Sequence, residues 1–440
     1  MKDSTKDPTS SRRRDTSEHR TSTAKPKPRA HLFRGMIKID DVEQAMERVE
    51  GVIEHTPLRH SRTVSEATGA DVHLKYENLQ RTGSFKIRGA YNKMSSLSDE
   101  EREAGVITAS AGNHAQGVAL AAREVGIDTK IVMPKDAAIS KVEATSEYGG
   151  DYVEIVLHGI DYDEAYEKAL EIGEKEGRVF VHPFDDEHVQ AGQGTVGLEI
   201  LDELPEVDTI IVAVGGGGLA AGVATAVKAR SPDTRVIAAQ AEGASSLKQS
   251  LQRGEVYERD SVSTISDGIA TRHIAESTFE VIKERVDEAV VVDDDETANA
   301  ILRLLEQDKT VVEGAGAVPV AAAVERDLDL EGETVVPLLC GGNIDSNVLS
   351  QVINRGLINA GRYLKFETVL HDKPGALVDI ATRIADHNAN IYAIHHDRMA
   401  KDVTLNAAEV EFEVETRSRE HANRLVRALE NEGYDIEVLG

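Results

Sequence analysis

Lys86 is the residue whose side chain offers the most definite chemistry. It lies in the string TGSFKIRGA, residues 82–90, with apolar Phe85 and Ile87 on either side. A lysine amine that is positioned and partly desolvated keeps a neutral fraction and can form a Schiff base with an aldehyde. A lysine taken alone is more often a solvated surface residue, so the meaning of Lys86 depends on the segments that accompany it.

A glycine-rich loop is the second candidate. The string VGGGGLAAG, residues 214–222, joins an apolar strand to a helix. Glycines let backbone N–H groups approach a phosphate at a helix N-terminus. A tight turn is the plainer interpretation. A dinucleotide fingerprint is a sharper one, because Gly216-x-Gly218-x-x-Ala221 is followed by Glu242 at the end of the next strand.

Two further loops follow apolar strands. The string SAGNHAQG, residues 110–117, begins a helix, and its hydroxyl, amides and N-terminus suit a carboxylate ligand. Ordinary N-capping by Ser110 or Asn113 explains the same residues equally well. The string CGGN, residues 340–343, follows a strand ending at Leu339, and by itself Cys340 resembles a small buried hydrophobic residue.

Short apolar runs that alternate with helical patterns organise the chain between residues 72 and 343. Repeated strand–helix units predict an α/β region with a largely parallel sheet covered on both faces. Helices are expected over 116–125 and 163–176. Strands are expected over 72–76, 105–108, 130–133, 153–156, 179–181, 209–214, 236–239 and 335–339.

The pattern changes near Gly361. Strands are predicted over 363–369, 390–395, 409–414 and 435–439, and helices over 376–387 and 419–430. The resulting order β-α-β-β-α-β is ferredoxin-like and predicts a separate C-terminal domain.

The lysine and glycine strings together resemble those of the pyridoxal-phosphate (PLP)-dependent threonine ammonia-lyases, or threonine dehydratases. The resemblance covers residues 36–440 and favours PLP over a dinucleotide. It implies a PLP fold type II catalytic region, tryptophan synthase β-like, with parallel sheets. In this family the lysine carries PLP and removes the substrate Cα proton, and the tetraglycine loop binds the phosphate. The asparagine of the 110–117 string hydrogen-bonds the 3′-oxygen of PLP, and a Ser or Cys faces the pyridine nitrogen.

These implied roles give a defined set of candidate residues. The catalytic residue is Lys86. The implied PLP-binding residues are Phe85, Lys86, Asn113, Gly215, Gly216, Gly217, Gly218, Leu219, Gly268 and Cys340. The implied substrate-binding residues are Ser110, Ala111, Gly112, Asn113 and His114. Glu313 lies in a Glu-Gly-Ala-Gly stretch of similar context, and no metal site is expected, because His182, His188, His395 and His396 lack the spacing and partners of a zinc cluster.

The strings at 371–377 and 389–391 resemble an ACT domain, an amino-acid-sensing module. The implied effector residues are Asp372, Pro374, Gly375, Asn390 and Ile391, and the expected effector is isoleucine or valine. Such sites usually lie between paired copies, so a homodimer or tetramer is expected. The predicted organisation is a basic leader (1–35), a catalytic region of two α/β subdomains (36–358) and an ACT domain (362–440).

The net charge and the number of cysteines indicate the cellular environment expected for the protein. The chain carries 50 basic and 78 acidic residues, a net charge of −28. Residues 1–35 hold ten basic and four acidic residues, so they carry +6 and residues 36–440 carry −34. An acidity spread along the chain is interpreted as adaptation to a salt-rich cytoplasm. A single cysteine excludes an intramolecular disulfide and fits a cytoplasmic location.

The N-terminal leader differs in composition from the rest of the chain. Residues 1–35 are rich in Ser, Thr, Pro and Arg, which predicts disorder. A solvated leader, or a start at Met36, is favoured over a basic arm for nucleic acid or membrane. No secretory signal is evident, and no apolar run approaches the ~20 residues that span a bilayer. Neither a nucleic acid nor a membrane is expected as a partner.

The predicted function is conversion of L-threonine to 2-oxobutanoate and ammonia, with L-serine giving pyruvate more slowly. The role in metabolism is left open between isoleucine biosynthesis and threonine breakdown. Serine racemase or serine dehydratase is the nearer alternative. It is disfavoured because the racemase loop has a serine where this chain has Ala111, and because Lys248 stands where an acidic metal ligand is expected. A non-catalytic amino-acid sensor is the second alternative, and the intact Lys86 argues against it.

Overall fold

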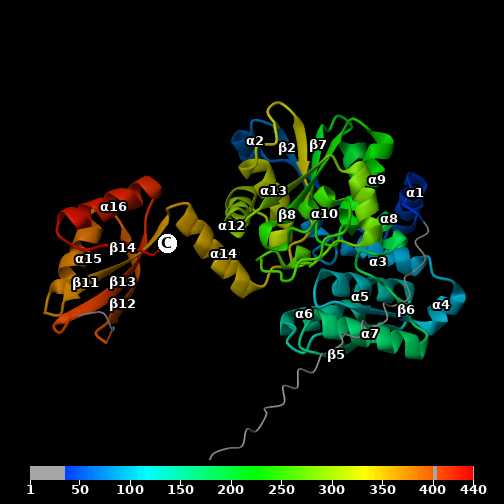
Figure 1. Cartoon of the computed structure of the whole chain (residues 1–440), viewed down its shortest axis with the longest axis horizontal. Coiled ribbons are helices and arrows are strands. Elements are labelled where there is room, and N and C mark those ends of the chain that lie inside the picture. The colour runs from blue at the N-terminus through cyan, green and yellow to red at the C-terminus, as the bar shows by residue number, and fades with distance from the viewer. Residues whose placement is uncertain (1–34, 400–403, 440) are drawn as a thin grey trace, which may run out of the picture. The chain divides into compact units, whose positions relative to one another are not determined.

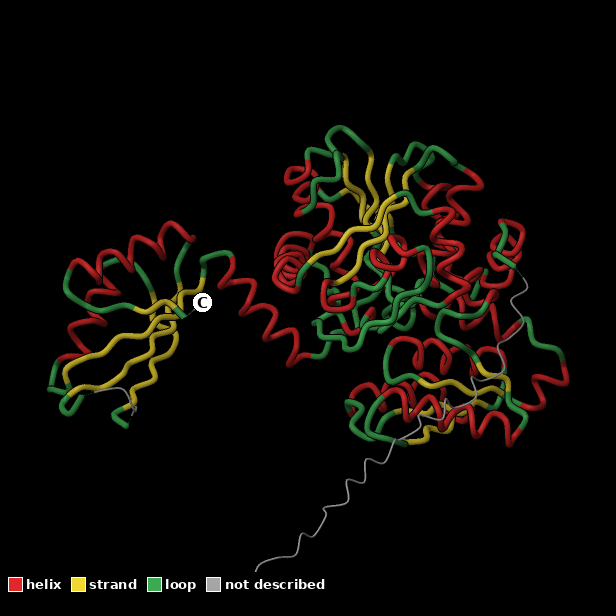
Figure 2. The backbone as a smooth tube through the Cα atoms, viewed as in Figure 1, coloured by secondary structure: helices red, strands yellow, loops and turns green. Residues whose placement is uncertain are grey.

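The structure is a computed structural model that describes residues 35–399 and 404–439. The predicted leader lies outside these residues, apart from Gly35. From residue 36 to residue 359 the chain forms two β-sheets with helices packed around them (Figures 1 and 2). In the described residues no helix is long and apolar enough to cross a membrane.

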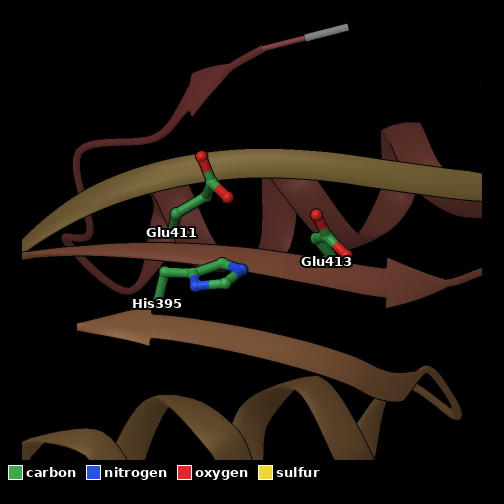
Figure 3. A group of neighbouring side chains, drawn as sticks. All are labelled: His395, Glu411 and Glu413. Atoms are coloured by element: carbon green, nitrogen blue, oxygen red, sulfur yellow. The ribbon is translucent and has the colours of Figure 1, made fainter.

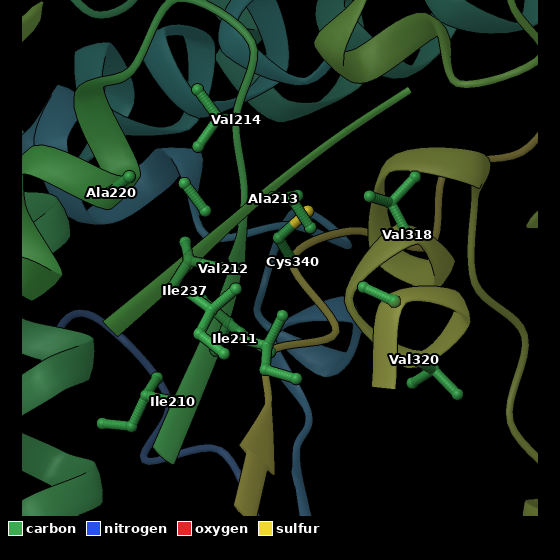
Figure 4. Packing of buried hydrophobic residues seen from close by; sticks show 14 of the residues in the cluster. Ile210, Ile211, Val212, Ala213, Val214, Ala220, Ile237, Val318, Val320 and Cys340 are labelled. Atoms are coloured by element: carbon green, nitrogen blue, oxygen red, sulfur yellow. The ribbon is translucent and has the colours of Figure 1, made fainter. Parts of the chain in front are cut away.

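The first sheet has the strand order β1-β2-β10-β7-β8-β9 and is parallel except for β1. Its central strand β7 is buried along its whole length. Figure 1 shows α9 and α13 flanking the sheet, and both helices contact β7 and β8. Figure 4 shows Ile210–Val214 among buried apolar side chains that include Val318 and Val320 of α13. The first sheet is therefore covered on both faces, as predicted.

The second sheet has the order β5-β4-β3-β6 and is entirely parallel. The alternating units by themselves predicted a largely parallel sheet, and the family resemblance implied more than one parallel sheet. The strands are divided between two sheets, in agreement with the resemblance. Strands β1 and β9 were missed. The bounds of the elements of both sheets are β1 (Leu58–His60), β2 (Asp71–Lys75), β3 (Val106–Ala109), β4 (Thr129–Met133), β5 (Val153–Leu157), β6 (Val179–Phe180), β7 (Thr209–Ala213), β8 (Arg235–Ala241), β9 (Glu288–Val292) and β10 (Thr334–Pro337).

The helices follow the expected alternation with the strands. The α-helices are α1 (Ile39–Val49), α2 (Arg62–Thr68), α3 (Lys86–Ser95), α4 (Asp99–Ala104), α5 (Asn113–Val125), α6 (Ile139–Gly149), α7 (Tyr162–Glu176), α8 (Glu187–Glu203), α9 (Gly218–Arg230), α10 (Leu247–Arg253), α11 (Glu276–Arg285), α12 (Asp294–Arg303), α13 (Gly314–Glu325) and α14 (Ser346–Asn359). Short 3₁₀ turns are η1 (Glu77–Leu79), η2 (Gly150–Tyr152), η3 (Glu242–Ala244) and η4 (Asp267–Ile269), and η5 (Leu304–Asp308) is a π-helix.

The C-terminal domain has the predicted order β-α-β-β-α-β. Its elements are β11 (Tyr363–His371), α15 (Ala376–Asp386), β12 (Asn390–Asp397), β13 (Ala407–Glu415), α16 (Arg419–Asn431) and β14 (Glu437–Val438). The sheet order is β12-β13-β11-β14, and every pairing is antiparallel. Alternate residues of β11 and β13 are buried, so one face of the sheet packs against the domain's own apolar core.

The other face of this sheet is strongly charged. His395, Glu411 and Glu413 offer ligand atoms within 4.8 Å of one another (Figure 3). Lys365 lies 2.9 Å from Glu411 and 3.6 Å from Glu413, so these carboxylates already have a cationic partner. The expectation that His395 lacks carboxylate partners is corrected here. Its partners lie on the neighbouring strand, and spacing along one segment does not reveal them.

A buried ion-pair network joins the first sheet to the beginning of α3. The Arg88 guanidinium donates to both carboxylate oxygens of Glu77 at 2.7 and 2.8 Å and to those of Glu199 at 2.5 and 2.9 Å. Lys75 Nζ lies 2.8 Å from Glu199 as well. Burial by itself would lower the pKa of Arg88, and the two carboxylates more than reverse this. Each charge therefore depends on the others for its stability inside the protein.

We predict that Arg88→Met destabilises the protein by about 3–5 kcal/mol, because it leaves two buried carboxylates without their shared cation. Denaturant-induced unfolding of the variant and the wild type measures the difference. Arg62→Met is the matched control, since Arg62 pairs with Glu66 on the surface of α2, and such pairs contribute about 0–1 kcal/mol. Equal losses in the two variants would contradict the role given to the buried network.

Candidate active site

A cavity of about 640 Å³ lies where loops from both sheets meet. Its walls come largely from loops that follow the carboxyl ends of β3, β6, β7 and β10, where ligands bind in open parallel sheets. All of the predicted cofactor- and substrate-binding residues line it: Phe85, Lys86, Ser110, Ala111, Gly112, Asn113, His114, Gly215, Gly216, Gly217, Gly218, Leu219, Gly268 and Cys340. Segments as far apart in sequence as those of Phe85 and Cys340 are thus brought to one place.

The lysine segment is held by the segment that follows β10. Phe85 N donates to the Cys340 carbonyl at 3.2 Å, and Gly342 N donates to the Gly83 carbonyl at 2.8 Å. Gly83 has φ of 69°, a left-handed conformation that glycine adopts without strain. These bonds fix the start of α3, whose first residue is Lys86.

Lys86 lines the cavity, and in the described part of the chain its amine has one hydrogen-bond acceptor. Its Nζ donates to the Pro183 carbonyl at 3.1 Å and lies 5.1 Å from the centre of the Phe85 ring. Burial lowers the pKa of Lys86 to about 8, while Cys340 and Glu313 act in the opposite direction. With that pKa, about one-tenth of the amine is neutral at pH 7. The neutral Lys86 amine can therefore act as a nucleophile or as a base near neutral pH.

The glycine loop enters helix α9 directly. Gly217 has φ of 93°, and a Cβ at Gly216 would lie 2.4 Å from the Phe184 ring, so neither position accommodates a side chain. Thr278 Oγ1 donates to the Gly216 carbonyl at 2.7 Å, which fixes the orientation of the loop peptide. The N-terminus of this 13-residue helix opens onto the cavity, where its unpaired N–H groups and dipole favour an anion.

The segment 110–113 enters helix α5 in the same way. Gly112 is the N-cap and no side chain caps the helix; Ser110 Oγ instead accepts from Gly112 N at 3.2 Å. The Asn113 amide donates to Glu313 Oε1 at 2.7 Å and accepts from Asn343 Nδ2 at 2.8 Å. N-capping is thus not the function of Ser110 or Asn113, and the first N–H groups of α5 remain available to a carboxylate.

Cys340 and Glu313 are neutral or partly neutral groups on the cavity wall. Burial raises the pKa of the Cys340 thiol, which stays protonated and donates to the Ala315 carbonyl at 3.2 Å. Burial also raises the pKa of Glu313 to about 7, although the hydrogen bond from Asn113 opposes this. Near neutral pH Glu313 therefore exchanges a proton, while Cys340 does not.

Sequence analysis missed several residues of the site. Pro183 and Phe184 line the cavity from the loop after β6, and His182 precedes them. Asn343 was quoted only as part of a string, but its amide contacts both Asn113 and Gln116. Their position in the sequence could have identified them, because each of these residues follows the carboxyl end of a parallel strand.

Comparison with known proteins agrees with this geometry. The profile of the family described as "pyridoxal-phosphate dependent enzyme" matches residues 49–341, and that of the ACT domain matches residues 363–434. The L-threonine ammonia-lyase of Thermotoga maritima is 48% identical over 92% of this chain and 100% of its own length. This chain belongs to the PLP-dependent enzymes. It carries a C-terminal ACT domain.

Two solved structures share the fold of the PLP-dependent region. Maize serine racemase superposes with a TM-score of 0.69 at 36% identity, over 74% of this chain and 99% of its own. The processed form of threonine deaminase isoform 2 from Solanum lycopersicum superposes with a TM-score of 0.68 at 39% identity, over 73% of this chain and 94% of its own. The predicted fold class, fold type II with an added ACT domain, is confirmed.

The residues on the cavity wall fit PLP. Lys86 offers an amine to the aldehyde, the glycine loop and α9 offer N–H groups to the phosphate, and the protonated Cys340 offers a neutral partner to the ring. The dinucleotide alternative required Glu242 near the glycine loop. Glu242 is exposed on η3 and does not line the cavity.

The predicted effector residues of the ACT domain fall into two groups. Asp372 follows the end of β11, where His371 pairs with Ala407, and forms an ion pair with Arg398 at 3.0 Å. Asn390 instead pairs with Glu415 at the other end of β13. The eight residue steps between these ends correspond to roughly 27 Å. One chain therefore does not bring the two groups together.

We predict that Lys86→Ala abolishes covalent attachment of PLP, because it removes the buried amine that the Pro183 carbonyl holds at the cavity. Borohydride reduction followed by mass spectrometry of the intact chain measures the attached mass. Lys168→Ala, on the surface of α7, is the control and should keep the full signal. A reduced adduct that persists in Lys86→Ala would overturn the assignment.

Proposed function

We propose that this protein is a threonine ammonia-lyase that converts L-threonine to 2-oxobutanoate and ammonia, with slower conversion of L-serine to pyruvate. The observation that carries the proposal is that the partly neutral Lys86 amine and the glycine loop at the start of α9 line the same cavity. The L-threonine ammonia-lyase activity of the Thermotoga relative supports the choice of substrate.

When bound, PLP supplies an aldehyde for the substrate amine and a ring that accepts electron density from Cα. Lys86 Nζ removes the Cα proton, for which its pKa of about 8 is well suited. The start of α5 at Ser110–Asn113 holds the substrate carboxylate, and the start of α9 holds the phosphate. The β-hydroxyl leaves with one proton as water, and hydrolysis of the released unsaturated amine consumes one water. The sum is threonine giving 2-oxobutanoate and ammonia.

Elimination is favoured over racemisation because of the residue at position 111. Racemisation needs a second acid or base on the opposite side of Cα from Lys86. The serine racemase family has a serine in this loop at the position of Ala111, which has no titratable or hydroxyl group. The high structural similarity to serine racemase reflects the shared fold and does not decide between the reactions.

The activity test compares both reactions in one sample. We predict keto-acid release from L-threonine that exceeds release from L-serine, with negligible formation of D-serine on a chiral column. Ala111→Ser is the informative variant, since it adds the hydroxyl that the racemases carry, and it should raise D-serine formation without abolishing elimination. Faster D-serine than pyruvate formation by the wild type would select the racemase alternative.

We propose that the ACT domain binds a branched-chain amino acid, isoleucine or valine, and changes the affinity for threonine. Such coupling is typically about 1–3 kcal/mol. The separation of Asp372 from Asn390 supports a site shared by two copies, in which the 372–375 turn of one chain meets Asn390 and Ile391 of the other. The edge strand β12, with Tyr392 and Ile394 exposed, is the proposed place of pairing. A homodimer or a tetramer follows from this arrangement.

A mixing experiment tests the shared site. We predict that Asp372→Ala and Asn390→Ala each remove the response of threonine turnover to isoleucine. Mixed dimers of the two variants should regain part of it, because one of their two sites carries neither substitution. Arg424→Ala, on the exposed face of α16, serves as control. No recovery in verified mixed dimers would place the effector within one chain or outside this domain.

We further propose that the acidity is an adaptation to a salt-rich cytoplasm. On the C-terminal sheet Glu367 lies opposite Glu411, and burial together with Glu409 and Glu437 raises the pKa of Glu367. Added salt screens such repulsion, with a Debye length of about 10 Å at 0.1 M and 3 Å at 1 M.

Residues 36–440 carry a net charge of −34, and salt screens the repulsion between their acidic side chains. We therefore predict that thermal stability and threonine turnover rise when KCl is raised from about 0.1 M to about 2 M. Circular dichroism melting and keto-acid assays at matched pH measure the two effects. Charge-neutral sucrose is the control for general stabilisation by excluded solutes. Equal stability at both salt concentrations would assign the acidity another cause.

A further inference from the structure

His182 connects two parts of the site that are distant in sequence. It follows strand β6 and lies partly buried, and its Nδ1 accepts hydrogen bonds from Phe184 N at 3.3 Å and Asp185 N at 2.8 Å. The ring therefore closes a tight turn over residues 182–185. Because Nδ1 accepts two N–H groups, it is the unprotonated nitrogen. Sequence analysis considered this histidine only as a possible zinc ligand and assigned it no role in the site.

The turn touches Lys86 on one side. The Pro183 carbonyl, inside the turn, accepts the hydrogen bond from Lys86 Nζ at 3.1 Å. No other hydrogen bond of this amine is found among the described residues. The position of one carbonyl oxygen thus decides where the amine points.

The turn touches the glycine loop on the other side. The Phe184 ring lies where a Cβ of Gly216 would be, and the Phe184 backbone lies 3.0 Å from the place of a Cβ at Gly218. The Phe184 carbonyl also accepts from Gln190 Nε2 at 3.1 Å, which fixes the turn to α8. A shift of this turn would therefore move both the lysine acceptor and the wall of the phosphate loop.

We infer that His182 is a positioning residue: by accepting the amides of Phe184 and Asp185 through Nδ1, it sets the Lys86 amine against the phosphate-binding glycine loop. Burial lowers the pKa of His182 to about 4, and Lys86 acts in the same direction against Asp185 and Asp186. The imidazole therefore keeps its free Nδ1 lone pair at neutral pH. The inference deepens the proposed function and rests on it only for the turnover measurement.

Aromatic packing is the competing explanation of His182. Its ring lies edge-on to Phe184 with centroids 4.7 Å apart, and Tyr166 and Phe180 are also near. Two substitutions separate the explanations. His182→Asn keeps an acceptor atom close to the position of Nδ1 but loses the ring. His182→Phe keeps an aromatic ring but has no acceptor.

The test uses the full chain with PLP bound. Hydrogen–deuterium exchange of the 181–189 peptide reports the two amides directly, and the rate of PLP release into a scavenger reports the site. We expect His182→Phe to exchange these amides and release PLP at least about tenfold faster, and to lower kcat for threonine by about 10–100-fold, since small misplacements of reacting groups have such effects. His182→Asn should stay within about threefold of the wild type in all three.

Each outcome bears on the inference. If His182→Phe behaves as the wild type, or if His182→Asn fails as severely as His182→Phe, the acceptor role is wrong and packing explains the residue. His188→Phe, at an exposed histidine on α8, controls for substitution in this region. Exchange and PLP release require no threonine, so a wild type that binds PLP but does not turn over threonine counts against the proposed function and leaves the inference on His182 testable.

Discussion

The buried pairing of Arg88 with Glu77 and Glu199 is the interaction on which the site depends most. It places charges where water does not reach, and it is stable only because the fork of the guanidinium meets both carboxylates and Lys75 supplies the second cation. The four side chains come from β2, η1, α3 and α8. Buried charges are stable only when their partners are accurately placed, so this network determines how the four elements pack.

Lys86 benefits from this constraint because it lies two residues before Arg88. The start of α3 is held by the ion pairs of Arg88 and by the backbone hydrogen bonds of the preceding segment to Cys340 and Gly342. Little freedom remains for the lysine except its own side-chain torsions, and Pro183 orients the amine. The result is a reactive group that is positioned before any ligand arrives, which lowers the entropic cost of reaction.

The sequence allowed much of this to be predicted. Runs such as 209–214 and the alternating strand 363–369 predicted their strands to within two residues, because burial on both faces or on one face leaves a clear pattern. Strand β1 was missed because Leu58–His60 is short and mostly polar, and β9 because Glu288 begins a brief run after a helix. The division into two sheets depends on which strands pair, and apolar content does not encode pairing.

The site was predictable where a whole string resembled a family and less so elsewhere. Lys86, Asn113 and the glycine loop came from such strings, and all of them line the cavity. The contribution of Pro183 is a backbone carbonyl, which any residue carries, so composition gives no signal for it. Asn343 acts through Asn113 and Gln116, which are far from it in sequence. His182 acts through the backbone amides of Phe184 and Asp185, and backbone amides give no signal in the sequence. The two groups of effector residues were joined by resemblance alone, and the strand register separates them.

The contact of Phe184 with Gly216 also has a meaning for the divergence of this protein. Two positions 32 residues apart share one small volume, so neither changes freely while the other stays the same. A larger residue at 216 becomes acceptable only after the ring at 184 has been replaced by something smaller, and that replacement opens the wall beside the lysine. Whichever of the two residues is substituted first, the protein with that single substitution has a damaged site. Variation should therefore accumulate around this pair of positions before it reaches them.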